Sequence, residues 1–286
     1  MKDKIRIAIQ KSGRLNEDSL KLLKDCGISI NNGKDQLKTT AANFPMEVYY
    51  LRNGDIPQYL RDGVVDLAIV GENLIVEKGE DIQTLEKLGF SKCNVSIAVP
   101  KELTYRGVAD LAGKKIATSY PNTITKYLSK WGIDADLHII NGSVEIAPNI
   151  GLSDAICDIV SSGSTLFKNN LKEVEVLFKS EAVLVSGDNL SDSKKEILNT
   201  LLFRIKAVLA GKNSRYVIMN LPNDAIDKVS ELLPVLKSPT VMPLVEPGWS
   251  SLHSVVNKNT FWEMVDELKA AGARDILVCP IERIIQ

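Results

Sequence analysis

The residues best suited to chemistry lie in one short segment near the middle of the chain. An apolar run that contains Asp154 and Asp158 leads into a loop of small hydroxyl residues around Gly163. Backbone N–H groups, hydroxyls and a following helix N-terminus at such a turn can bind phosphate. We therefore predict a phosphate site at the loop, and the alternative is an ordinary strand-to-helix connection in which Ser and Thr serve as caps. The loop residues are Ser161, Ser162, Gly163, Ser164 and Thr165.

A ligand with several phosphates needs more positive charge than this loop provides. One helix N-terminus contributes about 0.3–1 kcal/mol for each anionic group, so a cation must share the charge. Lys11 and Arg14, on the first strand-to-helix turn, are the candidate cations. Glu145, Asp154 and Asp158 could hold Mg²⁺ directly or through water, and otherwise they are caps or solvated surface residues.

Several common mechanisms are not encoded. The turn at residues 10–15 (QKSGRL) has neither the GxGxxG spacing of dinucleotide binders nor the GxxxxGK[ST] spacing of a P-loop. The two histidines, His138 in a strand-like stretch and His253 in the last part of the chain, are poor candidates for a catalytic base. Transfer at a sugar carbon that already bears a good leaving group needs positioning and charge stabilisation, and no nucleophilic side chain.

Composition limits the class of protein. The 286 residues are 44% hydrophobic and 25% charged with a net charge of -1, which excludes gross disorder and a basic nucleic-acid binder. No apolar run reaches the roughly 20 residues of a membrane-spanning helix, and the start lacks the apolar stretch of a secretory signal, so a cytoplasmic location is expected. The four cysteines are far apart and are expected to be reduced thiols, mostly in cores.

Strands and helices alternate along the first 211 residues, which predicts an α/β fold. Residues 6–9, 46–51 and 63–71 are expected strands, and a second α/β unit begins near residue 94. A long amphipathic helix is expected over residues 192–210, ended by Gly211. Two similar glycine-led segments, at residues 63–67 and 151–155, suggest two lobes that present strand ends to a shared cleft.

The pattern changes after Gly211. Strands are expected at residues 215–221, 240–244, 251–256 and 275–278, and helices at 224–233 and 260–271. This βαββαβ order is the ferredoxin-like arrangement. It predicts a separate domain that need not take part in the chemistry.

These segments together resemble one family. Residues 10–15, 66–73, 117–121 and above all 141–166 are similar to the motifs of ATP phosphoribosyltransferase, and the βαββαβ tail resembles its long form. The resemblance implies that N1 of the ATP adenine attacks C1 of phosphoribosyl pyrophosphate with Mg²⁺, releasing pyrophosphate in the first step of histidine biosynthesis. It also implies a two-lobed core like that of periplasmic binding proteins. Lobe I would comprise residues 1–93 and 181–211, lobe II residues 94–180, and the regulatory domain residues 212–286.

The resemblance also implies roles for individual residues. Glu145, Asp154 and Lys11 would be catalytic, and Asp154 and Asp158 would bind the metal. The remaining substrate contacts would be Arg14, Asp66, Glu72, Tyr120, Ala155, Asp158 and residues 161–165, with Asp66, Glu72 and Tyr120 on the nucleotide side.

For the tail, the family implies feedback inhibition by histidine bound between the tail domains of neighbouring subunits in a dimer or hexamer. The candidate contacts are Asn220, Leu236, Ser238, Thr240 and Ala273, which could equally be plain turn residues. Nucleic acid and membrane are not expected partners. Two alternatives stay open from the residues alone: a non-catalytic two-lobed small-molecule binding protein, and a catalytic relative that uses another nucleobase.

Overall fold

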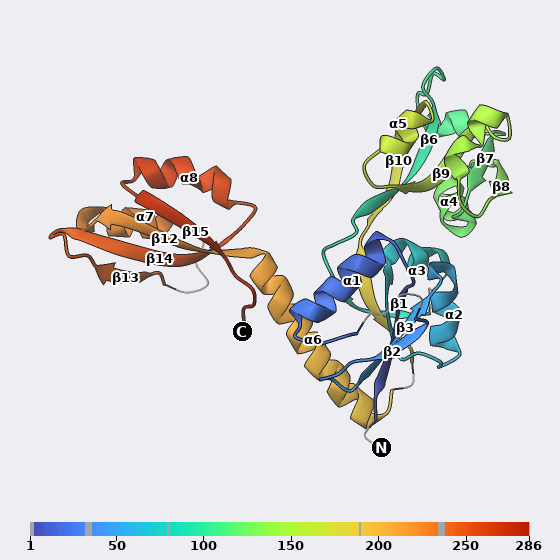
Figure 1. The fold of residues 1–286 in the computed structure, drawn as a ribbon. Helices are drawn as coiled ribbons and strands as arrows, with labels where there is room; N and C mark the ends of the chain where they lie inside the picture. The colour runs from blue at the N-terminus through green and yellow to red at the C-terminus, as the bar shows by residue number, and fades with distance from the viewer. Residues whose placement is uncertain (1–2, 32–35, 79–80, 189, 234–237, 286) are drawn as a thin grey trace. The chain divides into compact units, whose positions relative to one another are not determined.

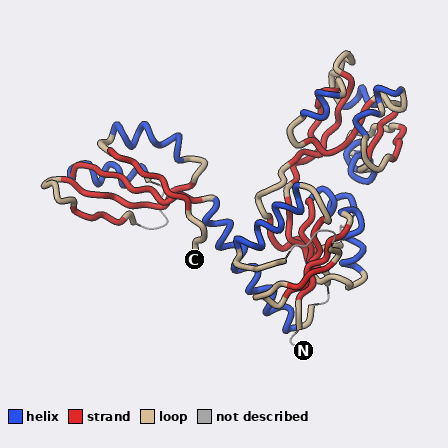
Figure 2. The backbone as a smooth tube through the Cα atoms, viewed as in Figure 1, coloured by secondary structure: helices blue, strands red, loops and turns tan. Residues whose placement is uncertain are grey.

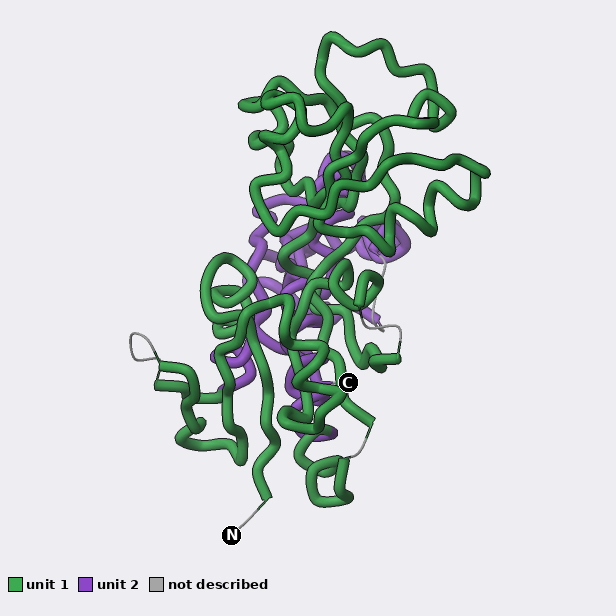
Figure 3. Tube along the Cα trace, turned by 90° about the vertical axis from the view of Figure 1, so that its right-hand side faces the viewer, with its two compact units in different colours: residues 1–21, 28–198 green, residues 22–27, 199–286 purple. Residues whose placement is uncertain are grey.

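The computed structural model describes residues 3–31, 36–78, 81–188, 190–233 and 238–285 (Figure 1). The chain divides into two compact units, residues 1–21 with 28–198 and residues 22–27 with 199–286 (Figure 3). The long helix α6 (Asp192–Lys212) begins in the first unit and continues in the second. No helix in the described ranges combines the length and apolar character needed to cross a membrane.

Lobe I of the first unit is built on a β-sheet flanked by helices (Figure 2). Its six strands have the order β2-β3-β1-β4-β11-β5. Its central strands β1, β3 and β4 are parallel, because β1 pairs in parallel with both neighbours. They form since their apolar residues supply a continuous core: Ile5, Ile7 and Ile9 are fully buried. The elements are β1 (Ile5–Gln10), α1 (Arg14–Asp25), β2 (Lys38–Thr40), β3 (Met46–Leu51), α2 (Ile56–Arg61), β4 (Leu67–Gly71), α3 (Glu72–Lys78), β5 (Gln83–Lys87) and β11 (Ala182–Ser186).

Lobe II has a five-stranded sheet in the order β10-β6-β9-β7-β8. Strands β7, β8 and β9 are parallel to one another, so their carboxyl ends meet at one edge, and β6 and β10 are antiparallel neighbours. Val95, Ile116, Ile124 and Cys157 belong to the core beneath this sheet. The elements are β6 (Cys93–Pro100), β7 (Lys115–Thr118), α4 (Pro121–Ser129), β8 (Asp136–Ile139), β9 (Ala155–Val160), α5 (Ser164–Lys168) and β10 (Leu171–Ser180).

The chain passes between the two lobes twice. It leaves the lobe I sheet at Lys87 and joins the lobe II sheet at Cys93, then returns between Ser180 and Ala182. The boundary between the compact units lies inside α6, after Leu198, whereas the sequence alone places the end of lobe I at residue 211. The sequence does not indicate this boundary, because the helical pattern of α6 continues through it without interruption.

The second unit contains a four-stranded sheet in the order β13-β14-β12-β15, in which every neighbouring pair is antiparallel. Val217, Leu252, Phe261 and Leu268 form its core, so α7 and α8 cover one face of the sheet. The βαββαβ arrangement predicted from the sequence is confirmed. The elements are β12 (Ser214–Pro222), α7 (Ile226–Leu232), β13 (Thr240–Pro243), β14 (Trp249–Asn257), α8 (Phe261–Ala270) and β15 (Arg274–Pro280).

Two expectations about glycines are wrong. Gly211 does not end α6, because the helix continues to Lys212; this glycine is buried, and a Cβ there would lie 2.7 Å from backbone atoms of Glu282 and Arg283. The expected strand over residues 63–71 begins only at Leu67, because Gly63, with φ +63°, belongs to the turn after α2.

The four cysteines are free thiols, but only two of them lie in cores, where most were expected. Cys26 and Cys157 are buried, whereas Cys93 is half-buried and Cys279 is exposed.

Candidate active site

The sequence-predicted phosphate loop lies at the carboxyl edge of the lobe II sheet. Strand β9 ends at Val160, and the loop leads into α5, where Gly163 adopts φ +70° directly before the first helical residue. The hydroxyl oxygens of Ser162 and Ser164 lie 3.0 Å apart, and the serine and threonine side chains of the loop are exposed. The loop therefore presents hydroxyls to the edge where parallel strands end, which is the usual ligand position in open α/β sheets.

Two carboxylates share this edge. Glu145 lies in the turn after β8 and Asp158 lies near the end of β9. Burial raises the pKa of the Asp158 carboxyl to about 6; the Ile159 N–H bond opposes this, and the negative charge of Glu145 adds to it. An acidic pair with one raised pKa is suited to receive a positive charge, whether a metal ion or a cationic sugar centre.

Tyr120 comes to the same edge from β7. Two side-chain hydroxyls link neighbouring segments at this edge. The Thr118 hydroxyl donates to the Cys157 carbonyl at 2.7 Å, and the Ser119 hydroxyl donates to the Ile140 carbonyl at 2.7 Å. Tyr120 is buried, and burial together with the charge of Asp158 raises the pKa of its phenol. The structure therefore brings Tyr120, Glu145, Asp158 and the loop together.

Asp154 is not brought to the loop, contrary to the sequence expectation. It precedes β9 at the amino end, where its carboxylate accepts the Lys115 N–H at 2.9 Å. Asp158 follows Asp154 by four positions, which along an extended strand is about 13 Å, so the two cannot hold one metal ion directly. Ala155, which follows it, is buried in the core at the same end of the strand and cannot contact a ligand at the loop.

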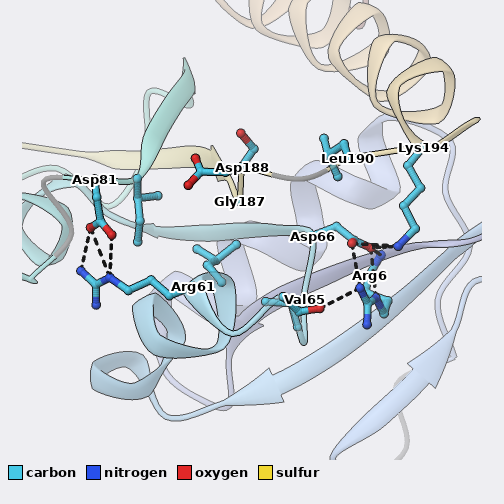
Figure 4. A pocket seen from close by; sticks show the side chains of 13 residues that line it. Arg6, Arg61, Val65, Asp66, Asp81, Gly187, Asp188, Leu190 and Lys194 are labelled. Carbon is cyan, nitrogen blue, oxygen red and sulfur yellow. Dashed lines mark hydrogen bonds and ion pairs between the residues drawn. The ribbon is translucent and has the colours of Figure 1, made fainter. Parts of the chain in front are cut away.

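Asp66 also lies away from the cleft, at the amino end of β4 (Figure 4). Its carboxylate bonds Arg6 at 2.9 Å and Lys194 at 2.8 Å, and the residue is 5% exposed. Although burial alone would raise the pKa of this carboxyl, the hydrogen bonds from Arg6 and Lys194 lower it. Asp66 thus joins β4 to β1 and α6 beside a pocket that also contains Arg61 and Asp81, and it lies at the opposite end of β4 from Glu72, another residue expected on the nucleotide side.

The remaining lobe I candidates lie at the carboxyl ends of its strands. Lys11 and Arg14 follow β1 and are exposed, and Glu72 follows β4, where it forms a 2.9 Å ion pair with Lys87. A cavity of about 240 Å³ is lined from both lobes of this unit. Its lining residues include Arg14 from lobe I and Ser161 from the lobe II loop. The lining also includes Gln10, Asn73, Lys92, Cys93 and Ile159.

Some residues at this cleft had no role assigned from the sequence. Asn73 donates to the Tyr120 hydroxyl at 2.8 Å, and Glu77 accepts hydrogen bonds from the first turn of α4. The sequence gives little indication of these roles, because polar residues are common in short helices and the hydrogen-bond partners of Asn73 and Glu77 are distant in the chain. Lys92 belongs to the segment that joins the lobes and Cys93 begins β6, and neither residue lies in a recognised motif.

A magnesium ion fits this edge only together with a substrate. Among the described residues no group of three or more His, Cys, Asp or Glu side chains converges on one point. Mg²⁺ usually keeps several waters and takes one or two carboxylates plus substrate phosphates. Glu145 and Asp158 supply the right donor atoms for that arrangement, and Asp158 with Asp154 does not.

In the second unit the predicted histidine contacts fall into three groups. Asn220 lies opposite Ser251 and Thr240 lies opposite His253, so both point to the sheet face away from α7 and α8. Ser238 is exposed in the segment before β13, and Leu236 lies outside the described residues. Ala273 is 4% exposed and packs in the core, so its side chain is not available to a ligand.

The fold and site define a two-lobed α/β protein with an exposed hydroxyl loop and two carboxylates at the carboxyl edge of the lobe II sheet, followed by a separate small domain. The family described as ATP phosphoribosyltransferase matches residues 52–207, and the C-terminal domain of the same family matches residues 211–283. The chain belongs to the ATP phosphoribosyltransferase family. These enzymes are glycosyltransferases that catalyse the first step of histidine biosynthesis, and the C-terminal domain implies feedback regulation by histidine.

Individual relatives agree with this assignment over the full length. An ATP phosphoribosyltransferase of Cytophaga hutchinsonii is 56% identical over 282 residues, 99% of this chain and 99% of that protein. One of Phocaeicola vulgatus is 53% identical over 98% of this chain and 99% of that protein. Among solved structures, the ATP phosphoribosyl transferase (HisG:HisZ) complex from Thermotoga maritima matches with a TM-score of 0.61 and 28% identity, covering 70% of this chain and 95% of that chain.

Proposed function

We propose that the chain transfers the phosphoribosyl group of phosphoribosyl pyrophosphate to N1 of ATP with the lobe II edge as the phosphoribosyl site. The observation that carries this assignment is that Glu145 and Asp158 lie near the ends of β8 and β9, at the edge that also carries the exposed hydroxyl loop at residues 161–165. The loop binds the sugar 5-phosphate, and the two carboxylates lie near the ribose. The cleft lies between the two lobes. One wall is lobe I, which comprises residues 1–93 and 181–211, and the other is lobe II, which comprises residues 94–180.

The chemistry requires a new N1–C1 bond as the C1–oxygen bond to pyrophosphate breaks. N1 of adenine already offers a lone pair, so the chain needs no general base to activate it. Positive charge that develops at C1 is stabilised by the carboxylates of Glu145 and Asp158, as at other glycosidic carbons. Exclusion of water by the two lobes protects C1 from hydrolysis.

Cations on the lobe I side complete the site. Lys11 and Arg14 are exposed at the carboxyl end of β1 and meet the leaving pyrophosphate or the ATP phosphates. Glu72 and Tyr120 line the nucleotide side. When bound, Mg²⁺ neutralises diphosphate charge, and Glu145 and Asp158 are the residues that would hold it.

Regulation and assembly belong to the second unit. We propose that histidine binds between tail domains of neighbouring subunits, near Asn220, Ser238 and Thr240, in a homo-oligomer that is a dimer or hexamer. Inhibition then requires histidine to bind one subunit arrangement better than another. The substrates are small nucleotides, and the reaction takes place in the cytoplasm.

The function is tested by ultraviolet detection of phosphoribosyl-ATP from ATP, phosphoribosyl pyrophosphate and Mg²⁺. Asp158→Asn should lower kcat/KM by about 100-fold or more, because it removes a charge that stabilises the transition state. Asp154→Asn is the matched control, since it replaces the same residue type at the opposite end of β9, and its turnover should stay close to wild type.

Two results would contradict the proposal. A product formed on another nucleobase would show that ATP is not the acceptor. Equal losses of kcat/KM in Asp154→Asn and Asp158→Asn would show that Glu145 and Asp158 have no specific part in the mechanism.

A further inference from the structure

Helix α3 of lobe I carries two polar residues that are almost fully buried. Asn73 and Glu77 are each 4% exposed. They are four positions apart, so they lie on the same face of the helix, one turn from each other. Both make hydrogen bonds to lobe II of the same compact unit. A buried carboxylate and a buried amide in a seven-residue helix need such partners, because an unpaired polar group in that position is costly.

Glu77 caps a helix of the other lobe. Its Oε1 accepts the backbone N–H of Asn122 at 2.9 Å, and its Oε2 accepts the backbone N–H and the hydroxyl of Thr123 at 2.8 and 2.7 Å. The Asn122 side-chain amide donates to the Glu77 carbonyl at 3.0 Å. The residue that precedes α4, Tyr120, supplies no side-chain cap. The first turn of α4 therefore takes its cap from a residue more than 40 positions earlier in the chain, in lobe I.

Asn73 makes the second connection, one turn earlier. Its side-chain amide donates to the Tyr120 hydroxyl at 2.8 Å, and its Oδ1 accepts from the Ser180 hydroxyl at 3.0 Å. Ser180 is the last residue of β10, where the chain returns to lobe I. The side chain is held over Gly71, where a Cβ would collide with the Asn73 Oδ1. Asn73 is thus fixed by its own lobe, by the returning strand and by Tyr120.

The partners of these two residues are at the corner between β7 and α4, beside the acidic pair. Thr118 of β7 lies opposite Cys157 of β9 in the parallel register, so Tyr120 follows β7 near Asp158. The backbone N–H of Tyr120 donates to the Thr118 hydroxyl at 2.8 Å, which makes the corner rigid. A shift of this corner would move Tyr120 relative to the carboxylate that faces the sugar.

We propose that Asn73 and Glu77 are positioning residues for the transfer, which act across the cleft by fixing the β7–α4 corner and Tyr120 beside Asp158. The inference rests on the function proposed above. Neither residue acts by touching a substrate: Glu77 acts through Thr123 and Asn122, and Asn73 acts through Tyr120. The phosphate loop on α5 has no part in these contacts, so binding of the sugar phosphate should not depend on them.

The test measures kcat and the KM of each substrate in Glu77→Gln, Thr123→Val and the double variant. A glutamine amide has one acceptor oxygen, and its NH₂ group would face the N–H donors of α4. We expect kcat to fall about tenfold to 100-fold and the KM of ATP to rise about fivefold or more, because a corner that lines the nucleotide side is displaced. The KM of phosphoribosyl pyrophosphate should stay within about twofold of wild type.

The double variant tests whether the two residues act as a unit. If Glu77 works through Thr123, the double variant should be no slower than Glu77→Gln alone. Glu47→Gln is the matched control, since Glu47 forms a hydrogen-bonded 2.9 Å ion pair with Lys38 within lobe I. Its kinetics should match wild type. Should Glu77→Gln fail to fold, Tyr120→Phe tests the Asn73 connection by the same two KM values.

Three outcomes overturn the inference. Kinetics of Glu77→Gln equal to those of Glu47→Gln remove any role, and a fall in kcat with both KM values unchanged shows only a loss of folded enzyme. Fully additive losses in the double variant show that Glu77 does not act through Thr123. A wild-type enzyme that makes no phosphoribosyl-ATP would instead contradict the proposed function, so the two failures are distinguishable.

Discussion

At the scale of single residues, the most informative group is the Asp158 carboxyl. It is half-buried beside Glu145, and burial is the main cause of its raised pKa. The free enzyme therefore keeps a carboxylate that is poorly stabilised until positive charge arrives at the edge of the sheet. This is the arrangement expected where a site binds a cationic transition state more tightly than it binds its own empty form.

The raised pKa gives a stability prediction. A carboxyl whose pKa is about 6 in the folded protein and 3.8 in the unfolded chain holds its proton more tightly when folded. Its contribution to stability is present below the unfolded value and is lost as pH rises through the folded value. Asp158→Asn should therefore be more stable than wild type at about pH 7.5, on the order of 2 kcal/mol, and the difference should shrink towards about pH 4.

Urea unfolding of both proteins at the two pH values measures this difference. Asp154→Asn serves as control, because the same change at the other end of β9 should not produce it. A gap between wild type and Asp158→Asn that is the same at both pH values would show that burial and Glu145 do not disfavour the charge of Asp158.

The site could be predicted from the sequence only in part. The hydroxyl loop, Glu145 and Tyr120 follow strand ends, and parallel strands bring such residues to one edge. Asp154 and Asp158 look like one cluster because they are close in sequence, but a strand extends about 3.3 Å for each residue and carries them apart. Glu77 could not be assigned a role, because its partners depend on how one lobe meets the other.

At the scale of elements, α6 contains a glycine that close packing requires, although no turn is present at that position. Gly211 is buried within the helix, and the backbone of Glu282 and Arg283 crosses it closely. The Ile284 N–H donates to the Ala207 carbonyl at 2.9 Å, one turn earlier on the same helix. The end of the chain is thus bound along the second half of α6.

Gly211→Ala should destabilise the protein although alanine is the better helix former. Helix propensity alone would favour alanine by about 1 kcal/mol, but the added Cβ would displace the backbone at Glu282 and Arg283. We expect a lower melting temperature, measured by circular dichroism. The control is Gly54→Ala, where the nearest atom, Lys78 Nζ, is 3.8 Å from the new Cβ. An unchanged or higher melting temperature for Gly211→Ala would mean that the chain end does not pack on this helix.

The elements themselves were largely predictable, and their ends were less so. The apolar runs of β1, β4 and β9 and the βαββαβ tail follow from periodicity. Short elements such as β2 and α3 were missed because three to seven residues give too little pattern. Glycine usually ends helices, which predicts a stop at Gly211, whereas the close crossing at this position involves Glu282 and Arg283, which are 71 and 72 positions later.

At the scale of the whole molecule, the proposed transfer site and the proposed histidine site lie in different units of the chain. The cleft is formed within the first unit, and the predicted histidine contacts Asn220 and Thr240 lie on one sheet face of the second. Under this proposal, the coupling between the two sites is a free energy difference between subunit assemblies, so inhibition and transfer are separate measurable properties.

Removal of the second domain should therefore abolish inhibition by histidine while turnover is retained. A chain that ends at Asn213 should keep transfer activity and lose inhibition by histidine, measured by the formation of phosphoribosyl-ATP. Asn220→Ala in the full chain separates binding from assembly: its oligomeric state should match wild type, and the histidine concentration for half inhibition should rise about tenfold, as expected for loss of a hydrogen bond to a charged ligand. Unaltered inhibition in the shortened chain would place the histidine site in the first unit.

The sheet order of lobe I sets an order of events during synthesis. Strand β11 lies between β4 and β5, although the whole of lobe II separates β5 from β11 along the chain. A growing polypeptide consequently has every strand of lobe II before it can pair the edge strand β5. The inserted lobe is then the first part able to fold to completion on the ribosome, and the lobe that begins the chain is closed only afterwards.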